Sequence, residues 1–304
     1  MSITGVRGLD YGLVLSEKPS KQYSIIFDGC SLDGNTSSCK IPVKNRREVE
    51  LFLLSLGQEA DVVMDDKARS LYPDVWNWLH GRTYSDVFSE LDWSYREEDE
   101  VIDIIGRIPL PISLNNSFIK IRIDDPDPER INQGYVHKKN QNNVLISKPY
   151  QCGKLFYFNG FNESSEFNID HSSDHLEGIF IFEIARQAGI ASAHLVGIPF
   201  SAPIIILKST IRYKKYVECR EPYIVRTIPI VRPRGGCSIV VYDVIQKGHS
   251  CVTGYLTGII YKTKETYQRF RHMHIAEPMN EKANTIVDLP YVASSEISSE
   301  AITE

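Results

Sequence analysis

The stretch from Gly178 to Leu195 constrains the fold more than any other part of the sequence. Its residues are apolar on almost every side of a helical projection, so the pattern leaves no face for solvent. A helix of this kind is buried within its domain. Glu183, Arg186 and Gln187 lie inside it, and a buried carboxylate is costly unless it is paired or used in chemistry. We therefore expect a central helix, buried on every side, that carries a functional site.

Long segments rich in Ile, Val, Tyr and Thr follow this helix, and Gly, Pro or charged residues separate them. This composition is typical of β-strands. The predicted strands are Pro203 to Val217, Pro222 to Val231, Cys237 to Gln246 and Ser250 to Lys262, with two shorter ones before the helix at Asn143 to Ser147 and Lys154 to Phe158. One buried helix with a run of antiparallel strands predicts an α+β hotdog fold, in which a curved sheet wraps the helix.

The first 115 residues predict a different unit, a small α/β domain of unknown role. Its expected elements are strands at Tyr23 to Asp28, Lys40 to Val43, Ala60 to Met64 and Val101 to Ile105, a helix at Asn45 to Leu56 and a broken helical stretch over 67–92. Residues 116–132 are rich in Asn, Asp and Pro and predict a linker. We expect the hotdog domain over 133–270 and a flexible tail over 271–304, where apolar anchors become rare.

Charge and cysteine content narrow the class of protein. The net charge is -5, and the Lys and Arg residues form no long run, so neither nucleic acid nor an anionic membrane is an expected partner. The six cysteines contain no CxxC pair, which predicts free thiols rather than a disulfide framework or a zinc site. The sequence shows no signal-peptide or membrane-spanning pattern. We expect a soluble, cytoplasmic protein that needs no metal ion or other cofactor.

Two motifs carry a resemblance to known families. Residues 178–187 read G-x4-E-x3-Q, which resembles the central-helix motif of hotdog β-hydroxyacyl-thioester dehydratases. A longer string runs from VHKK at 136–139 through NVLIS at 143–147 and residues 167–175 to ARQAG at 185–189. It resembles the A-factor synthase (AfsA-like) hotdog family over about residues 133–262. The dehydratases' proline-rich histidine loop is missing. The A-factor enzymes usually carry two such repeats, so a second hotdog comes from another subunit or from a diverged first half.

The resemblance implies enzymatic work on an acyl thioester of acyl-carrier protein or CoA. A-factor enzymes join a β-ketoacyl chain to a small phosphorylated acceptor, dihydroxyacetone phosphate, and the product closes to a butenolide or γ-butyrolactone of secondary metabolism. Two alternatives remain open: a dehydratase or isomerase of β-hydroxyacyl thioesters, and a non-catalytic hotdog module that binds a carrier protein. A homodimer is expected, because hotdog sites usually form across paired sheets.

Glu183 is the candidate catalytic acid or base. Desolvation of a buried carboxyl would raise its pKa toward neutrality, which suits proton transfer. Its alternative role is an ion pair with Arg186 or Arg212. We place Gln187, Arg186 and Gly178 with the substrate-binding residues, and the guanidinium of Arg186 suits a phosphate.

The residues just before the helix include His171 and His175, each preceded by an aspartate. A histidine beside an acid, close to a buried carboxylate, suits acyl chemistry, so both are candidate catalytic residues. Asp174 is a further candidate for substrate binding. It also forms a potential capping box with Glu177, which is the structural alternative.

Overall fold

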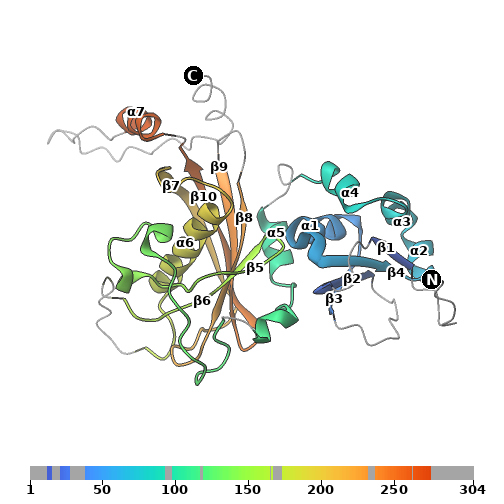
Figure 1. The fold of residues 1–304 in the computed structure, drawn as a ribbon, viewed down its shortest axis with the longest axis horizontal. Helices are drawn as coiled ribbons and strands as arrows, with labels where there is room; N and C mark the ends of the chain where they lie inside the picture. The colour runs from blue at the N-terminus through green and yellow to red at the C-terminus, as the bar shows by residue number, and fades with distance from the viewer. Residues whose placement is uncertain are drawn as a thin grey trace, which may run out of the picture.

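The computed structural model describes residues 12–15, 21–27, 38–92, 98–116, 119–164, 166, 173–231, 237–261 and 263–274. They form two connected parts, each with its own β-sheet (Figure 1). A four-stranded sheet with its helices comes first, and a six-stranded sheet with one long central helix follows. The predicted α+β class, a hotdog layer preceded by a small α/β unit, is confirmed.

The first sheet is mixed, with the strand order β1-β4-β2-β3. Strand β2 is parallel to β3 and β4, whereas β1 is antiparallel to β4. Helix α1 supplies the crossover between parallel strands, as the pairing requires. A hotdog sheet is antiparallel, so the first half is not a diverged second hotdog. The strands are β1 (Gly12–Leu15), β2 (Tyr23–Phe27), β3 (Cys39–Val43) and β4 (Ala60–Met64), and the helices are α1 (Arg46–Leu56), α2 (Asp66–Leu71), α3 (Pro73–Leu79), α4 (Tyr84–Glu90) and α5 (Glu98–Ile105).

Helix α5 stands where the sequence predicted a strand at Val101 to Ile105, and that prediction is wrong. The β-branched residues of this segment favour a strand by propensity. However, Val101, Ile102 and Ile105 are all buried, and their spacing places them on one face of a helix. This face packs against the second sheet, at β9 and β10. Packing between the two parts therefore outweighs the local preference.

The second sheet is antiparallel throughout, with the order β5-β6-β8-β9-β10-β7. Its strands are β5 (Tyr150–Cys152), β6 (Leu155–Asn159), β7 (Ile204–Tyr213), β8 (Ile224–Ile230), β9 (Cys237–Gln246) and β10 (His249–Ile260). Helix α6 (Gly178–Leu195) lies on one face of this sheet, and α7 (Lys264–His274) follows β10 (Figure 1). None of the described helices has the length and hydrophobicity of a membrane span.

The segment Asn143 to Ser147 is not a strand, in contrast to the prediction. Residues 141–143 form a short 3-10 helix, and Ile146 and Ser147 make only isolated bridges. The side chain of Gln187 explains this. It accepts a hydrogen bond from the Leu145 amide at 2.8 Å and donates one to the Asn143 carbonyl at 2.9 Å. A helix side chain thus satisfies backbone groups that a neighbouring strand would otherwise bind.

Helix α6 has the predicted bounds, Gly178 to Leu195. The helix packs closely on the sheet. The hydroxyl oxygens of Ser192 and Thr227 of β8 are 2.6 Å apart, and an added Cβ at Gly189 would lie 3.5 to 3.6 Å from Leu256 and Val240. The burial is incomplete at the first turn, where Ile179 is 60% exposed. The N-cap is Glu177, with no side-chain cap, so the predicted capping box is absent.

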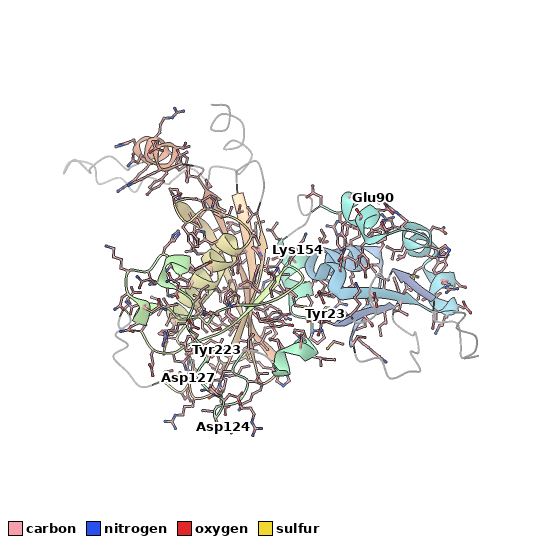
Figure 2. The ribbon with its side chains drawn as sticks, viewed as in Figure 1. Tyr23, Glu90, Asp124, Asp127, Lys154 and Tyr223 are labelled. Carbon is pink, nitrogen blue, oxygen red and sulfur yellow. The ribbon has the colours of Figure 1, made fainter. Side chains whose placement is uncertain are left out.

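A buried ion pair joins the two parts on the face of the sheet opposite α6. Arg226 of β8 and Asp243 of β9 are almost fully buried, and their side chains are 2.6 Å apart. Arg226 also donates hydrogen bonds to the carbonyls of Ile105 and Ile108, at the end of α5 and just beyond it. Nearby, Tyr23 of β2 donates to the Pro109 carbonyl at 3.0 Å, where the two parts meet (Figure 2). The hotdog sheet is therefore covered on both faces within one chain.

Candidate functional site

Glu183 forms the centre of a buried charge cluster on α6. Arg186 donates two hydrogen bonds to its carboxylate, from Nε to Oε2 at 2.6 Å and from Nη2 to Oε1 at 2.7 Å. The Lys138 ammonium lies 2.9 Å from Oε1, and Gln187 donates to the same oxygen at 2.9 Å. Lys138 also pairs with Glu166. Two cations and two carboxylates thus nearly neutralise one another.

The pKa of Glu183 moves in the direction opposite to the prediction. Burial alone would raise it, but the hydrogen bonds and positive charge of Arg186, with the bonds from Lys138 and Gln187, lower it to about 2. Glu183 is therefore a fixed anion at neutral pH. Its alternative role, the ion pair with Arg186, is the one that the structure shows, while Arg212 instead pairs with Asp99 of α5.

His137 and His194 form a second cluster that sequence reasoning missed. Their Nε2 atoms are 2.9 Å apart, and Nδ1 of His194 lies 2.8 Å from the Ile198 carbonyl. A carbonyl only accepts, so His194 carries its hydrogen on Nδ1 and accepts through Nε2 when neutral. His137 then donates from Nε2, and its Nδ1 keeps a free lone pair. Burial, His194 and Arg186 lower the pKa of His137, which favours this neutral state.

The backbone and the neighbouring rings hold this pair in place. His137 adopts the left-handed conformation, with φ 55°, and directly precedes Lys138 in the chain. The rings of Tyr135 and Phe200 pack around His194. The VHKK string at 136–139 was the available signal, since it carried the family resemblance. The separation of 57 positions between His137 and His194 hid the contact from sequence reasoning.

An apolar pocket opens beside the charge cluster, between α6 and the ends of β7, β9 and β10. Arg186 lines it together with Gly189, Ile206, Leu256 and Ile260, among other residues, and it is the one charged side chain of the described lining. The cavity has a volume of about 40 Å³. Nε and Nη2 of Arg186 donate to Glu183, whereas Nη1 has no hydrogen-bond partner among the described residues. The pocket thus pairs an apolar interior with one free guanidinium donor.

His175 lies in a different environment from Glu183. Its Nδ1 is 2.8 Å from the exposed carboxylate of Asp174, and its ring packs on Tyr216. In the described part of the chain, no contact links His175 or Asp174 to Glu183. Gly178 lies at the start of α6, where an added Cβ would come within 2.7 Å of the Tyr213 hydroxyl. His171 lies outside the described residues.

This fold and this site define the second part of the molecule as a hotdog domain with a charged cluster on its central helix. Residues 119–262 match the A-factor biosynthesis hotdog domain (AfsA). This match, which covers just under half of the chain, confirms the predicted resemblance to the AfsA-like hotdog family. No curated protein matches the sequence.

Solved structures similar to this chain each cover less than half of it. An uncharacterized protein from Pyrococcus horikoshii is 17% identical and covers 44% of this chain and 95% of its own, with a TM-score of 0.33. A thioesterase from Haemophilus influenzae is 12% identical and covers 46% and 94%, with a TM-score of 0.35. A hypothetical thioesterase with coenzyme A, from Streptococcus pneumoniae, is 18% identical and covers 35% and 78%, with a TM-score of 0.28.

Proposed function

We propose that this protein is an acyl-thioester enzyme of the A-factor type. It transfers a β-ketoacyl chain from a carrier-protein or CoA thioester to the hydroxyl of a small phosphorylated acceptor such as dihydroxyacetone phosphate. The product then closes to a butenolide or γ-butyrolactone. One observation carries this proposal: Arg186 borders the apolar pocket with a free donor, while Glu183 fixes its other edge.

In this proposal the apolar pocket widens to receive the acyl chain, because its cavity of about 40 Å³ is smaller than such a chain. Its interior offers Ile206, Leu256 and Ile260 to methylene groups, and burying each methylene contributes about 0.8 kcal/mol. The free Nη1 of Arg186 donates to the thioester carbonyl oxygen, where negative charge develops during attack. Glu183 is then a positioning residue, because it holds the guanidinium rather than the substrate.

His137 acts as the general base of the proposed reaction. Its free Nδ1 takes the proton from the acceptor hydroxyl as the oxygen attacks the thioester carbon. The C–S bond then breaks, and protonated His137 returns the proton to the departing thiolate. His194 keeps Nε2 of His137 engaged and so presents Nδ1 to the substrate. His137 thereby takes the role that the sequence suggested for His175 or His171.

The two alternatives have less support. A dehydratase that uses Glu183 as an acid needs a carboxyl that is protonated near neutral pH, whereas the pKa of Glu183 is about 2. A non-catalytic carrier-binding module does not require a neutral histidine next to a free guanidinium donor.

Mass spectrometry of a carrier protein loaded with a β-ketoacyl chain tests the proposal. We expect the intact carrier to lose the whole chain only when both this protein and dihydroxyacetone phosphate are present. The variant Arg186→Lys should transfer the chain more slowly, because a lysine cannot both form the two hydrogen bonds to Glu183 and donate into the pocket. Loss of one water mass from a β-hydroxyacyl carrier without the acceptor would instead indicate a dehydratase. No change in any combination would contradict acyl transfer.

We also propose that the chain forms a homodimer through the edge strand β7. This strand pairs only with β10 in the described sheet, and Leu207 and Tyr213 on it are 51% and 58% exposed. Exposed edges with apolar residues favour pairing with another strand. Sedimentation should show a dimer for the wild type and a monomer for Leu207→Glu, and a monomeric wild type would contradict the proposal.

A further inference from the structure

Helix α7 carries exposed positive charge next to the rim of the apolar pocket. Arg269 and Arg271 are exposed, and neither forms an ion pair with a described residue. Lys264 at the helix start is exposed as well, whereas Glu265 is the one acidic residue of the helix. The whole chain has a net charge of -5. The basic surface of α7 therefore contrasts with the charge of the molecule that carries it.

Packing against the sheet fixes the position of α7. The rings of Tyr267 and Phe270 lie 5.6 and 5.5 Å from the ring of Tyr261. Tyr261 is buried, and its amide donates to the Pro203 carbonyl at 3.0 Å. It directly follows Ile260, which lines the apolar pocket. Figure 1 shows α7 beyond the end of β10, outside the layer of α6 and the sheet.

We propose that α7 is the docking surface for an acidic face of the acyl-carrier protein that delivers the chain. This inference rests on the proposed function, since it names the partner of the same site. A carrier that inserts its acyl chain past Ile260 has to sit outside the pocket rim, which places it beside α7. Complementary charge between two surfaces speeds their encounter and orients them, and salt weakens this effect. Tyr267 and Phe270 hold the helix, while Arg269 and Arg271 remain free for the partner.

Steady-state kinetics on two donors tests the docking surface. The donors are a β-ketoacyl carrier protein and the same acyl group on N-acetylcysteamine, which has neither protein nor phosphate. We expect Arg269→Glu combined with Arg271→Glu to raise KM for the carrier about tenfold at low salt, with less effect at high salt. Turnover of the N-acetylcysteamine thioester should stay unchanged. The control, Lys40→Glu with Lys67→Glu, reverses two exposed charges of the first part and should leave both donors unaffected.

The outcomes separate this inference from the proposed function. If the wild type processes both donors and the α7 variant keeps its KM for the carrier, acyl transfer stands and the docking surface is wrong. The same acyl group on CoA serves as a third donor, and an equal rise of KM for the carrier and for this acyl-CoA would assign α7 to CoA phosphates and overturn the inference. If the wild type processes neither donor, the proposed function fails. Direct binding of the loaded carrier, weakened by the α7 reversal, would then still support docking.

The acidic segment that follows α7 is a competing occupant. Residues 275–304 contain Glu277, Glu281, Asp288, Glu296, Glu300 and Glu304, with one lysine. If this segment occupies α7 in the full chain, a chain ending at 274 should bind the carrier more tightly, and charge reversal on α7 should weaken carrier binding only in that shorter chain. That result would still place the carrier on α7. Charge reversal that weakens carrier binding in neither chain would overturn the inference.

Discussion

At the scale of single residues, the site depends on a carboxylate that stays ionised because its partners outweigh its burial. Arg186, Lys138 and Gln187 all donate to Glu183. Sequence reasoning found Glu183, Arg186 and Gln187, because charged and polar residues stand out in an apolar helix. It missed Lys138 and His137, since both lie in a loop whose place beside α6 no local pattern reveals.

The low pKa of Glu183 predicts a stability component that depends on pH. A carboxyl whose folded pKa is lowered stabilises the protein above its unfolded pKa and loses this contribution as pH falls through the folded value. The window therefore runs from about pH 4.5 down to about pH 2, and its size is about 3 kcal/mol. Other carboxylates with lowered pKa values, such as Glu48 and Asp86, are present in both proteins. Denaturation across this range should therefore show a loss that is about 3 kcal/mol larger in the wild type than in Glu183→Gln. The exposed Glu129→Gln is the control, and equal pH profiles for the wild type and Glu183→Gln would contradict the account.

At the scale of elements, helix α6 and the strands behind it were predictable because burial leaves a clear pattern in sequence. The bounds of α6 and β9 agree with the prediction, and β7, β8 and β10 differ only at their ends. Helix α5 and the loop at 143–147 were not predictable in this way. Their structures depend on contacts with the other half of the molecule and with Gln187, which local propensity does not contain.

Gly189 on α6 sets the width of the proposed acyl pocket. A Cβ added there meets Leu256 and Val240 at ordinary contact distances, so Gly189→Ala fits without strain. The change should raise the free energy of unfolding by up to about 1 kcal/mol, because glycine disfavours a helix interior. It should also raise KM for longer acyl chains relative to short ones, since the added methyl narrows a small cavity. A variant that is stabilised but keeps its chain-length preference would place the acyl chain elsewhere.

At the scale of the whole molecule, the two parts share one hydrophobic core, and we expect them to unfold as one unit. A single buried cluster of hydrophobic residues extends from the first sheet to the face of the hotdog sheet opposite α6. The role of residues 1–115 and the linker boundary at 116–132 stay predictions, and the family match at 119–262 begins within that linker. The structure gives the first part at least one task, which is to cover a sheet face that would otherwise expose apolar side chains.

The Arg226 and Asp243 pair tests this coupling between the parts. Arg226→Met leaves Asp243 as a buried charge and removes the bonds to the end of α5, so it should cost about 3 to 5 kcal/mol. Denaturant unfolding should still show one transition for both parts. Arg212→Met is the matched control, because Arg212 also reaches α5 but pairs with exposed Asp99 and should cost at most about 1 kcal/mol. Two separate transitions in the wild type would refute a single unit.

The most direct test of the central claim is the pH dependence of acyl transfer in two histidine variants. The pKa of His137 is lowered from its ordinary value, so the wild-type rate should fall only as pH drops below this lowered value and His137 becomes protonated. His137→Gln should lose about 10²- to 10⁴-fold in kcat and this acidic limb, whereas His175→Gln should resemble the wild type. Full activity in His137→Gln, or the loss of activity in His175→Gln instead, would contradict the account.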